Sequence, residues 1–342
     1  MGIEVMGAGA PARAVRFAKA VARAACASST AARAACAAAV VAAARVEWIG
    51  PVAAGWVVEA RLASRPTGSS RGTAITATGE EVVVDRLPRD ASEGKVIRLM
   101  IVRAAIAGPG RLKRAQGRPT EAALAEPTLA DRLRATGAAV RVVRRLDGHE
   151  WDELIDEALA AETEFPGGKL LFAPTAAMTT IDIDGDLGPE ALAKAAVQAI
   201  AAALPRFDLA GSIAIDFPTL PTKAARRRVD DALEFALAAW PHERTAMNGF
   251  GLVQIVARLE RPSLLHLASW QRAGLVWRRL LRRAEALEGT GSIELAINPR
   301  LETAIDQAHT NELERRTGKR VEVSTVATLA LDAPHAQLIN DD

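Results

Sequence analysis

The sequence predicts a mixed α/β (α+β) protein, and three observations support this class. Short β-like runs separated by Gly, Ser and Asp turns fill residues 48–119. A strand, an amphipathic helix and a second strand follow between residues 178 and 217. Another strand–helix–strand unit occupies residues 292–323. With 342 residues, 49% of them hydrophobic, the chain is long enough for two or three domains with their own cores.

The overall composition narrows the function classes. A net charge of only +2 excludes a polybasic nucleic-acid arm, although local Lys and Arg clusters can still neutralise phosphates. The two cysteines, Cys26 and Cys36, form no C-x-x-C motif, which favours a reducing, cytoplasmic compartment and argues against structural zinc. No apolar run is long enough and sufficiently free of charge to span a membrane.

Alanine punctuated by arginine dominates the first 45 residues, and no strand alternation precedes Val46. We expect residues 1–45 to be an unstructured tail or an artefact of the start site or reading frame. An arginine-bearing helical targeting segment is the alternative. We base no fold prediction on this stretch.

Residues 46–119 have the pattern of a small β-barrel. Strands are predicted at residues 55–62, 72–77, 81–84 and 96–102. Five or so strands of this length suit an OB-type barrel. Trp56 is either a surface on which bases stack or a core residue of the barrel, and the second interpretation is at least as well supported. Residues 120–150 follow as a Pro- and Ala-rich linker with one helix-like run.

The most informative segment joins two aspartate-bearing strands through one helix. Two isoleucines alternate with Asp182 and Asp184, so both aspartates share one face of a strand. Pro189 suits the first turn of a helix, and a second strand carries Asp216 near its end. Such a crossover makes the strands parallel, so Asp182 and Asp216 are expected to be neighbours at one edge. One buried helix stripe is predicted from apolar residues at every fourth position: Leu192, Ala196, Ile200 and Leu204.

Neighbouring carboxylates repel each other unless a cation or a proton lies between them. Mg²⁺ prefers oxygen ligands, usually takes one or two from carboxylates and keeps several waters. We therefore expect Asp182, Asp216 and Asp184 to hold Mg²⁺, which can polarise a bound phosphodiester and activate water. The structural alternative is that Asp216 simply ends a strand and Asp184 belongs to a polar turn. Basic residues, Lys223 and Arg226 among them, follow Asp216 closely and are expected to lie beside the metal.

Four segments resemble the ribonuclease E/G family, in the family's order and at compatible spacing: residues 165–171, 177–184, 206–217 and 250–254, with 261–264 after the last. The resemblance covers roughly residues 150–265. It implies a single-strand-specific endoribonuclease whose RNase H-like catalytic domain spans residues 151–270. In that family the aspartates matching Asp182 and Asp216 hold the metal, and an asparagine stands where this chain has Asp184.

The resemblance also implies RNA contacts. The family's barrel binds single-stranded RNA, which points to Trp56 and Lys113 here, with weak affinity expected. Arg258 and Arg261 correspond in part to the arginines of a family T-R-K-R segment. Gln254 replaces a family glutamate, and the second acid after Asp216 is absent. The zinc-linking cysteine pair and a full sensor for the RNA 5′ end are missing, so we expect neither zinc-linked oligomers nor 5′-end sensing.

Residues 271–342 are predicted to form a small C-terminal domain that resembles the corresponding part of the family. A strand at residues 292–298 leads into a helix from Pro299 towards Arg316, with Gly318 as its C-cap, and a strand at residues 319–323 follows. Packing or subunit contact is its default role, which leaves room for a homodimer.

Three functional interpretations follow. The first is a cytoplasmic, Mg²⁺-dependent endoribonuclease that cuts single-stranded RNA in RNA processing or decay. The second is a non-catalytic RNA-binding relative in which the fold persists and the chemistry has decayed. The third is a structural protein that binds neither RNA nor metal.

Overall fold

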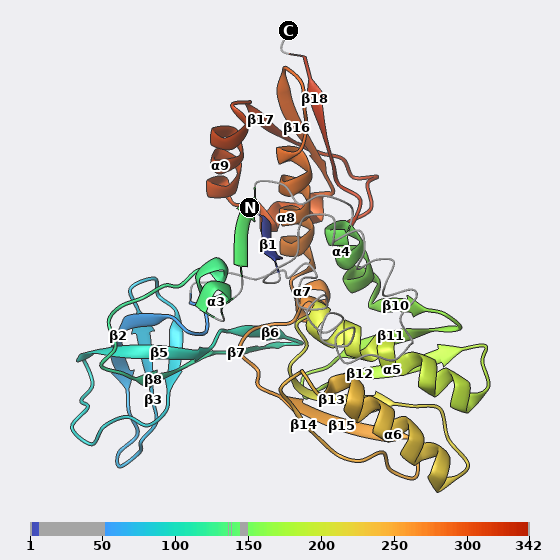
Figure 1. Cartoon of the computed structure of the whole chain (residues 1–342). Helices are drawn as coiled ribbons and strands as arrows, with labels where there is room; N and C mark the ends of the chain where they lie inside the picture. Colours follow the sequence, from blue (N-terminus) through green and yellow to red (C-terminus); the bar gives the residue numbers. More distant parts are fainter. Residues whose placement is uncertain (1, 7–51, 136, 138, 144–149, 341–342) are drawn as a thin grey trace. The chain divides into compact units, whose positions relative to one another are not determined.

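The computed structural model describes residues 2–6, 52–135, 137, 139–143 and 150–340, and it confirms the mixed α/β class (Figure 1). The chain divides into two compact units, Met1–His266 and Leu267–Asp342. The first unit contains a closed β-barrel and a six-stranded sheet, and the second contains a three-stranded sheet. No helix in the described ranges is sufficiently long and apolar to cross a membrane.

A closed five-stranded barrel fills the N-terminal part of the first unit, in the order β2-β3-β4-β8-β5. All pairs are antiparallel except β4 with β8. The four predicted strands appear with ends shifted by at most two residues, and a short hairpin separates β5 from β8. The strands are β2 (Val57–Ser64), β3 (Gly72–Thr76), β4 (Glu81–Val84), β5 (Val96–Arg103), β8 (Ala115–Pro119) and, in the hairpin, β6 (Ile106–Gly108) and β7 (Arg111–Lys113).

The barrel core consists of small and branched apolar side chains, as the alternating strands require. Leu62, Val82 and Leu99 are fully buried in it, and Trp56 packs against it from the side. The Trp56 indole N–H donates to the Pro127 carbonyl at 3.4 Å. This placement favours the packing role of Trp56 over an open stacking surface.

A two-stranded sheet corrects the prediction for the N-terminal tail. Strand β1 (Gly2–Met6) pairs antiparallel with β9 (Ala139–Val143), whereas no strand is predicted in residues 1–45. The linker at residues 120–150 likewise contains a strand in addition to the predicted helix, because β9 follows helix α3 (Leu129–Ala135). Residues 7–51, the rest of the predicted tail included, lie outside the described part of the chain.

The six-stranded sheet has the order β10-β11-β12-β13-β15-β14. Strands β12 and β13 are parallel and every other pair is antiparallel. The parallel pair is joined by the predicted helix, which begins with Pro189 in its first turn and buries all four stripe residues. The strands are β10 (Glu162–Phe165), β11 (Gly168–Pro174), β12 (Thr179–Gly185), β13 (Gly211–Asp216), β14 (Glu243–Arg244) and β15 (Leu252–Ala257).

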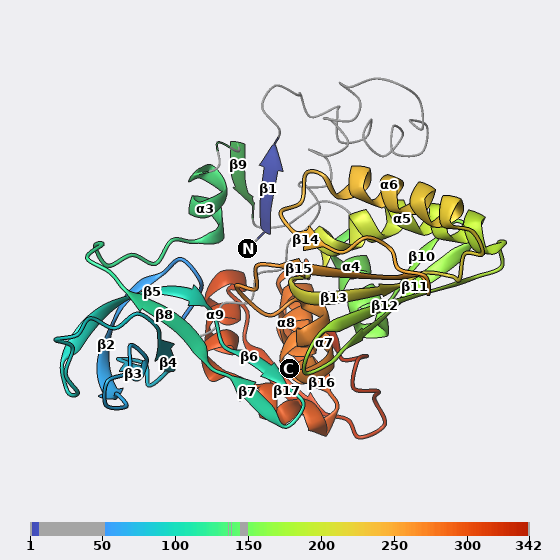
Figure 2. The same ribbon diagram turned by 90° about the horizontal axis from the view of Figure 1, so that it is seen from below.

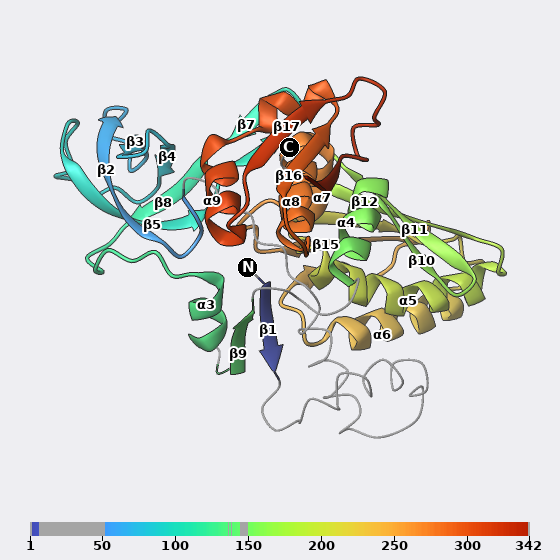
Figure 3. The same ribbon diagram turned by 90° about the horizontal axis from the view of Figure 1, so that it is seen from above.

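Helices α5 (Pro189–Arg206) and α6 (Lys223–Leu237) run side by side along one face of this sheet (Figures 1, 2 and 3). The side chains that the sheet buries alternate along its strands, with Ile181, Ile215 and Ile255 fully buried. Helix α4 (Glu150–Ala160) precedes β10 and contacts it. The residues between the buried positions belong to the opposite face, where the aspartates lie.

The second unit contains a three-stranded sheet in the order β17-β16-β18. The predicted helix from Pro299 to Arg316 is broken, because Ile305 is extended and the Asp306 carboxylate caps a new helix by accepting from the Ala308 N–H at 2.9 Å. Gly318 is the C-cap, as predicted, with φ 69°. The third strand is an addition to the predicted unit. The elements are α8 (Arg272–Glu285), β16 (Ser292–Ile297), η1 (Pro299–Ala304), α9 (Gln307–Thr317), β17 (Val321–Thr325) and β18 (His335–Ile339), preceded by α7 (Leu264–Trp270) at the boundary.

Candidate active site

Asp182 and Asp216 are direct partners in the parallel register of β12 and β13. Their preceding residues, Ile181 and Ile215, are also partners and are fully buried, whereas both aspartates are exposed. The two carboxylates therefore project from the same face of the sheet, on strands about 4.8 Å apart. The expectation that these residues are neighbours in space is confirmed.

Asp184 lies two residues further along β12 and is exposed on the same face. Its partner on β11 is Lys169, whose ammonium group pairs with Glu162 at 3.2 Å. The Ile183 backbone N–H donates to Asp182 Oδ1 at 2.9 Å. This hydrogen bond orients the Asp182 carboxylate, because it ties one oxygen to the strand that carries it.

Two glycine contacts seat a hairpin tip against the end of β12. Gly168 is the strand partner of Gly185, and Gly167 has φ 91° in the turn between β10 and β11. A Cβ atom on Gly185 would lie 2.3 Å from the Gly167 carbonyl oxygen, so only glycine allows this approach. The Pro166 turn thus lies at the same edge as the aspartates, which gives the motif at residues 165–171 a structural reason.

Helices α5 and α6 both begin at the edge where β12 and β13 end, because each follows its strand in the chain. The Thr222 hydroxyl accepts from the Ala225 N–H at 3.1 Å and caps α6. Arg228, in the second turn of α6, pairs with Glu190 in the first turn of α5 at 2.9 Å and joins the N-terminal parts of the two helices. Helix N-termini carry partial positive charge, so this edge favours a bound anion.

The two basic residues predicted beside the aspartates differ in what they contact. Lys223 is exposed in the first turn of α6. The Arg226 guanidinium is half-buried and donates to the Leu220 carbonyl at 2.7 Å, which ties the loop between β13 and α6 to the helix. Lys223 can reach a ligand at this edge, whereas the geometry of Arg226 fits a role in holding the loop.

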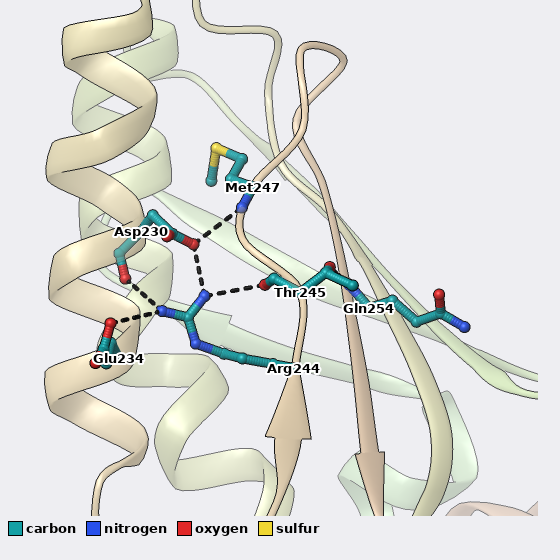
Figure 4. Close-up of polar contacts among 6 residues, drawn as sticks. All are labelled: Asp230, Glu234, Arg244, Thr245, Met247 and Gln254. Atoms are coloured by element: carbon teal, nitrogen blue, oxygen red, sulfur yellow. Dashed lines mark hydrogen bonds and ion pairs between the residues drawn. The ribbon is translucent and has the colours of Figure 1, made fainter.

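Gln254 adds a neutral polar group to the same face. It is exposed on β15 and is the strand partner of Ala214, two residue pairs before the Asp216–Leu252 pair. Figure 4 shows the Gln254 side chain pointing away from α6, whereas Arg244, the partner of Ile255 on the neighbouring strand, points towards α6. The site therefore has a carboxamide beside its carboxylates, where the sequence predicts only the loss of an acid.

The remaining predicted RNA contacts differ in how exposed their side chains are and in whether they already form ion pairs. Arg258 is exposed and pairs with Glu260 at 3.3 Å. The Arg261 side chain is only 14% exposed and forms two hydrogen bonds to the Asp208 carboxylate, so its geometry fits a structural ion pair. Lys113 is exposed on β7, where desolvation and then the charges of Arg103 and Arg111 lower its pKa.

The donor set fits a partly hydrated Mg²⁺ ion. Within the described residues, no three His, Cys, Asp or Glu side chains gather closely enough to hold a metal by themselves. Mg²⁺ commonly takes one or two protein carboxylates and completes its shell with water or phosphate oxygens, which the exposed pair Asp182 and Asp216 allows. Asp184, two residues further along β12 on the same face, would offer a further carboxylate near such an ion.

Comparison with known proteins finds a matching segment that contains these residues. Residues 124–258, which include Asp182 and Asp216, match the Ribonuclease E/G family. The chain is 35% identical over 134 residues to ribonuclease G of Salmonella typhimurium (strain SL1344), a match that covers 35% of this chain and 27% of the relative. It is 36% identical over 126 residues to ribonuclease G of Escherichia coli (strain K12), covering 33% of this chain and 26% of the relative. The matched segment thus spans about a quarter of the length of these relatives, and over this segment the chain is similar to the ribonuclease E/G family.

Proposed function

We propose that the protein is a Mg²⁺-dependent endoribonuclease that cuts single-stranded RNA in the cytoplasm. One observation carries the proposal: Asp182 and Asp216 are register partners on parallel strands, exposed on one face, inside the segment that matches the ribonuclease E/G family. The relatives named ribonuclease G support a ribonuclease function. Mg²⁺ bound at this pair would supply polarisation of a phosphoryl oxygen.

The surroundings of the pair suit a phosphodiester substrate. The N-terminal turns of α5 and α6 face the same edge, and Lys223 is exposed there. The six-stranded sheet, with two helices along one face, is compatible with an RNase H-like catalytic domain, and the five-stranded barrel is compatible with an OB-type RNA-binding domain. Within this proposal, Lys113 and Arg258 contact the RNA backbone, and the chain's own acids hold the metal.

The test is cleavage of an unstructured RNA with a 5′ fluorescent label, in Mg²⁺, by the wild type and by two variants. Asp182→Asn and Asp216→Asn keep the size of each side chain and remove its charge, so we expect each to lower the cleavage rate about 100-fold or more. Asp231→Asn is the matched control, because Asp231 is an exposed carboxylate on α6 whose partner, Arg227, is 3.9 Å away. Equal rates in wild type, Asp182→Asn and Asp216→Asn would refute the proposal.

A non-catalytic RNA-binding protein is the second candidate, and Gln254 favours it. A neutral amide stands on the carboxylate face where the family sequence has glutamate. This candidate predicts RNA binding that weakens with salt but no Mg²⁺-stimulated cleavage. Gln254→Glu then provides a direct comparison: restored cleavage would show that this one position had removed the activity.

A further inference from the structure

Phe250 is the most exposed large apolar side chain of the described residues, with 83% of its surface accessible. It lies in the turn that connects β14 to β15, between Asn248 and Gly251. An exposed phenylalanine gains no burial in the folded chain, so its ring is available to a ligand. The turn that carries it is not a loose loop.

Hydrogen bonds within the turn fix its backbone. Asn248 Oδ1 accepts from the Phe250 N–H at 2.9 Å and from the Leu252 N–H at 3.1 Å. Gly251 has φ 93°, and a Cβ atom there would lie 2.5 Å from the Phe217 carbonyl oxygen. The Phe217 N–H in turn donates to the Gly251 carbonyl at 3.2 Å. The turn is thus seated directly on the residue that follows Asp216.

A buried ion pair anchors the other side of the same turn, as Figure 4 shows. Arg244, 11% exposed, donates to Asp230 Oδ1 at 2.6 Å and to the Asp230 carbonyl at 3.1 Å. The same Asp230 oxygen accepts from the Met247 N–H at 3.0 Å. Since Asp230 belongs to α6, this contact fastens the turn to the helix that begins beside the carboxylates.

The strand register places the turn next to the carboxylates. Asp216 and Leu252 are partners on antiparallel strands, so β15 begins where β13 ends. Phe250 precedes Leu252 by two residues and therefore lies at the carboxyl end of β13. Leu252 is 40% exposed and extends the apolar surface towards Asp216.

We propose that Phe250 is a stacking surface for a base of single-stranded RNA, positioned beside the Asp182–Asp216 pair. The inference rests on the proposed function, because it places the RNA at that pair. A planar ring beside an anion-favouring edge suits a ligand that alternates aromatic bases with phosphates. Every base has a π-face, so stacking here fixes the strand without reading its sequence. A rigid turn lowers the entropic cost of binding, since the ring is already in place.

The experiment uses the full chain and a short unstructured RNA that contains 2-aminopurine, whose fluorescence is quenched by stacking. Binding is measured in EDTA, so that cleavage does not interfere, and the variants are Phe250→Ala, Phe250→Trp and Phe235→Ala. Phe235 is the matched control, because it is 62% exposed near the far end of α6 from the carboxylates. We expect Phe250→Ala to lose the quenching and to bind about 5- to 100-fold more weakly, while Phe250→Trp and Phe235→Ala stay close to wild type.

The outcomes separate this inference from the proposed function. Loss of quenching in Phe250→Ala supports stacking even if no RNA is cut, which would remove only the nuclease proposal. Equal affinity and quenching in Phe250→Ala and Phe235→Ala would overturn the stacking role while leaving cleavage untouched. Failure of the wild type to bind RNA both in EDTA and with Ca²⁺ in place of Mg²⁺ would overturn both proposals. A change in sedimentation of Phe250→Ala without any change in RNA binding would assign the ring to a protein contact and overturn the inference.

Discussion

Whether a charged side chain is available to a ligand depends on contacts that the sequence does not state. Arg258 and Arg261 are three residues apart, yet their side chains differ in exposure. The Arg258 side chain is 76% exposed, whereas the Arg261 side chain is 14% exposed and pairs with Asp208. Arg226 resembles a phosphate contact in the sequence but donates to a loop carbonyl. The aspartates were easier to place, because strand alternation alone assigns Asp182 to a face.

His266 provides a test at the residue scale. Desolvation, and then the charge of Lys113, lowers the pKa of His266 to about 4. The imidazole Nδ1 lies 2.6 Å from the Ser263 hydroxyl, which donates to it when the ring is neutral. An unfolded chain binds this proton near pH 6.5, whereas the folded chain resists protonation down to about pH 4. The contribution of neutral His266 to the free energy of unfolding is therefore fully present above pH 6.5. It is lost progressively as the pH falls from 6.5 towards 4.

Between pH 7 and pH 5 we expect His266 to account for a loss on the order of 2 kcal/mol in the free energy of unfolding. Urea unfolding at both pH values, in wild type and His266→Gln, measures it, because the other titrating groups contribute equally to both proteins. His335→Gln, at an exposed position on β18, should keep the wild-type dependence. An unchanged pH dependence in His266→Gln would contradict the assignment.

At the scale of elements, local periodicity predicted β12, α5 and β13 because their apolar residues repeat with the period of each structure. The parallel register, which pairs Asp182 with Asp216, then followed from the crossover rule. Pairing between distant segments was not predictable in the same way. Strand β1 finds its partner more than 130 residues away in β9, and such a partner leaves no local signal.

The break at Asp306 had a sequence signal that was missed, because aspartate is a preferred N-cap. The proposed stacking role of Phe250 had no such signal in the sequence. A phenylalanine beside apolar residues suggests a core position, and only the three-dimensional turn leaves it exposed. Gln254 was recognised as a departure from the family sequence, but its place on the carboxylate face required the register of β15 with β13.

The seating of the β10–β11 hairpin on β12 predicts an asymmetric effect of two glycine substitutions. A methyl group on Gly185 would collide with the Gly167 carbonyl at 2.3 Å and with Leu192 at 2.7 Å, so we expect Gly185→Ala to lower the free energy of unfolding by about 1–3 kcal/mol. Gly188→Ala is the control, since it has φ −57° and meets no atom within 4 Å. Chemical unfolding measures both, and equal stability of the two variants would show that the close approach is not maintained.

For the whole molecule, 43 basic and 41 acidic residues leave almost no net attraction for RNA. The proposed RNA binding therefore depends on local arrangement: helix N-termini, exposed basic side chains and the proposed cation at the carboxylates. The last of these is the central claim, because phosphodiester chemistry depends on it and the family match alone does not test it.

Binding of Mn²⁺, a paramagnetic substitute for Mg²⁺, tests that claim without relying on activity. Electron paramagnetic resonance follows the free aqueous ion, whose signal decreases as protein takes it up. We predict that the wild type and Asp231→Asn bind Mn²⁺ in competition with Mg²⁺, and that Asp182→Asn and Asp216→Asn each lose this binding. Identical Mn²⁺ uptake by all four proteins, or none by the wild type, would contradict a cation site at the paired aspartates.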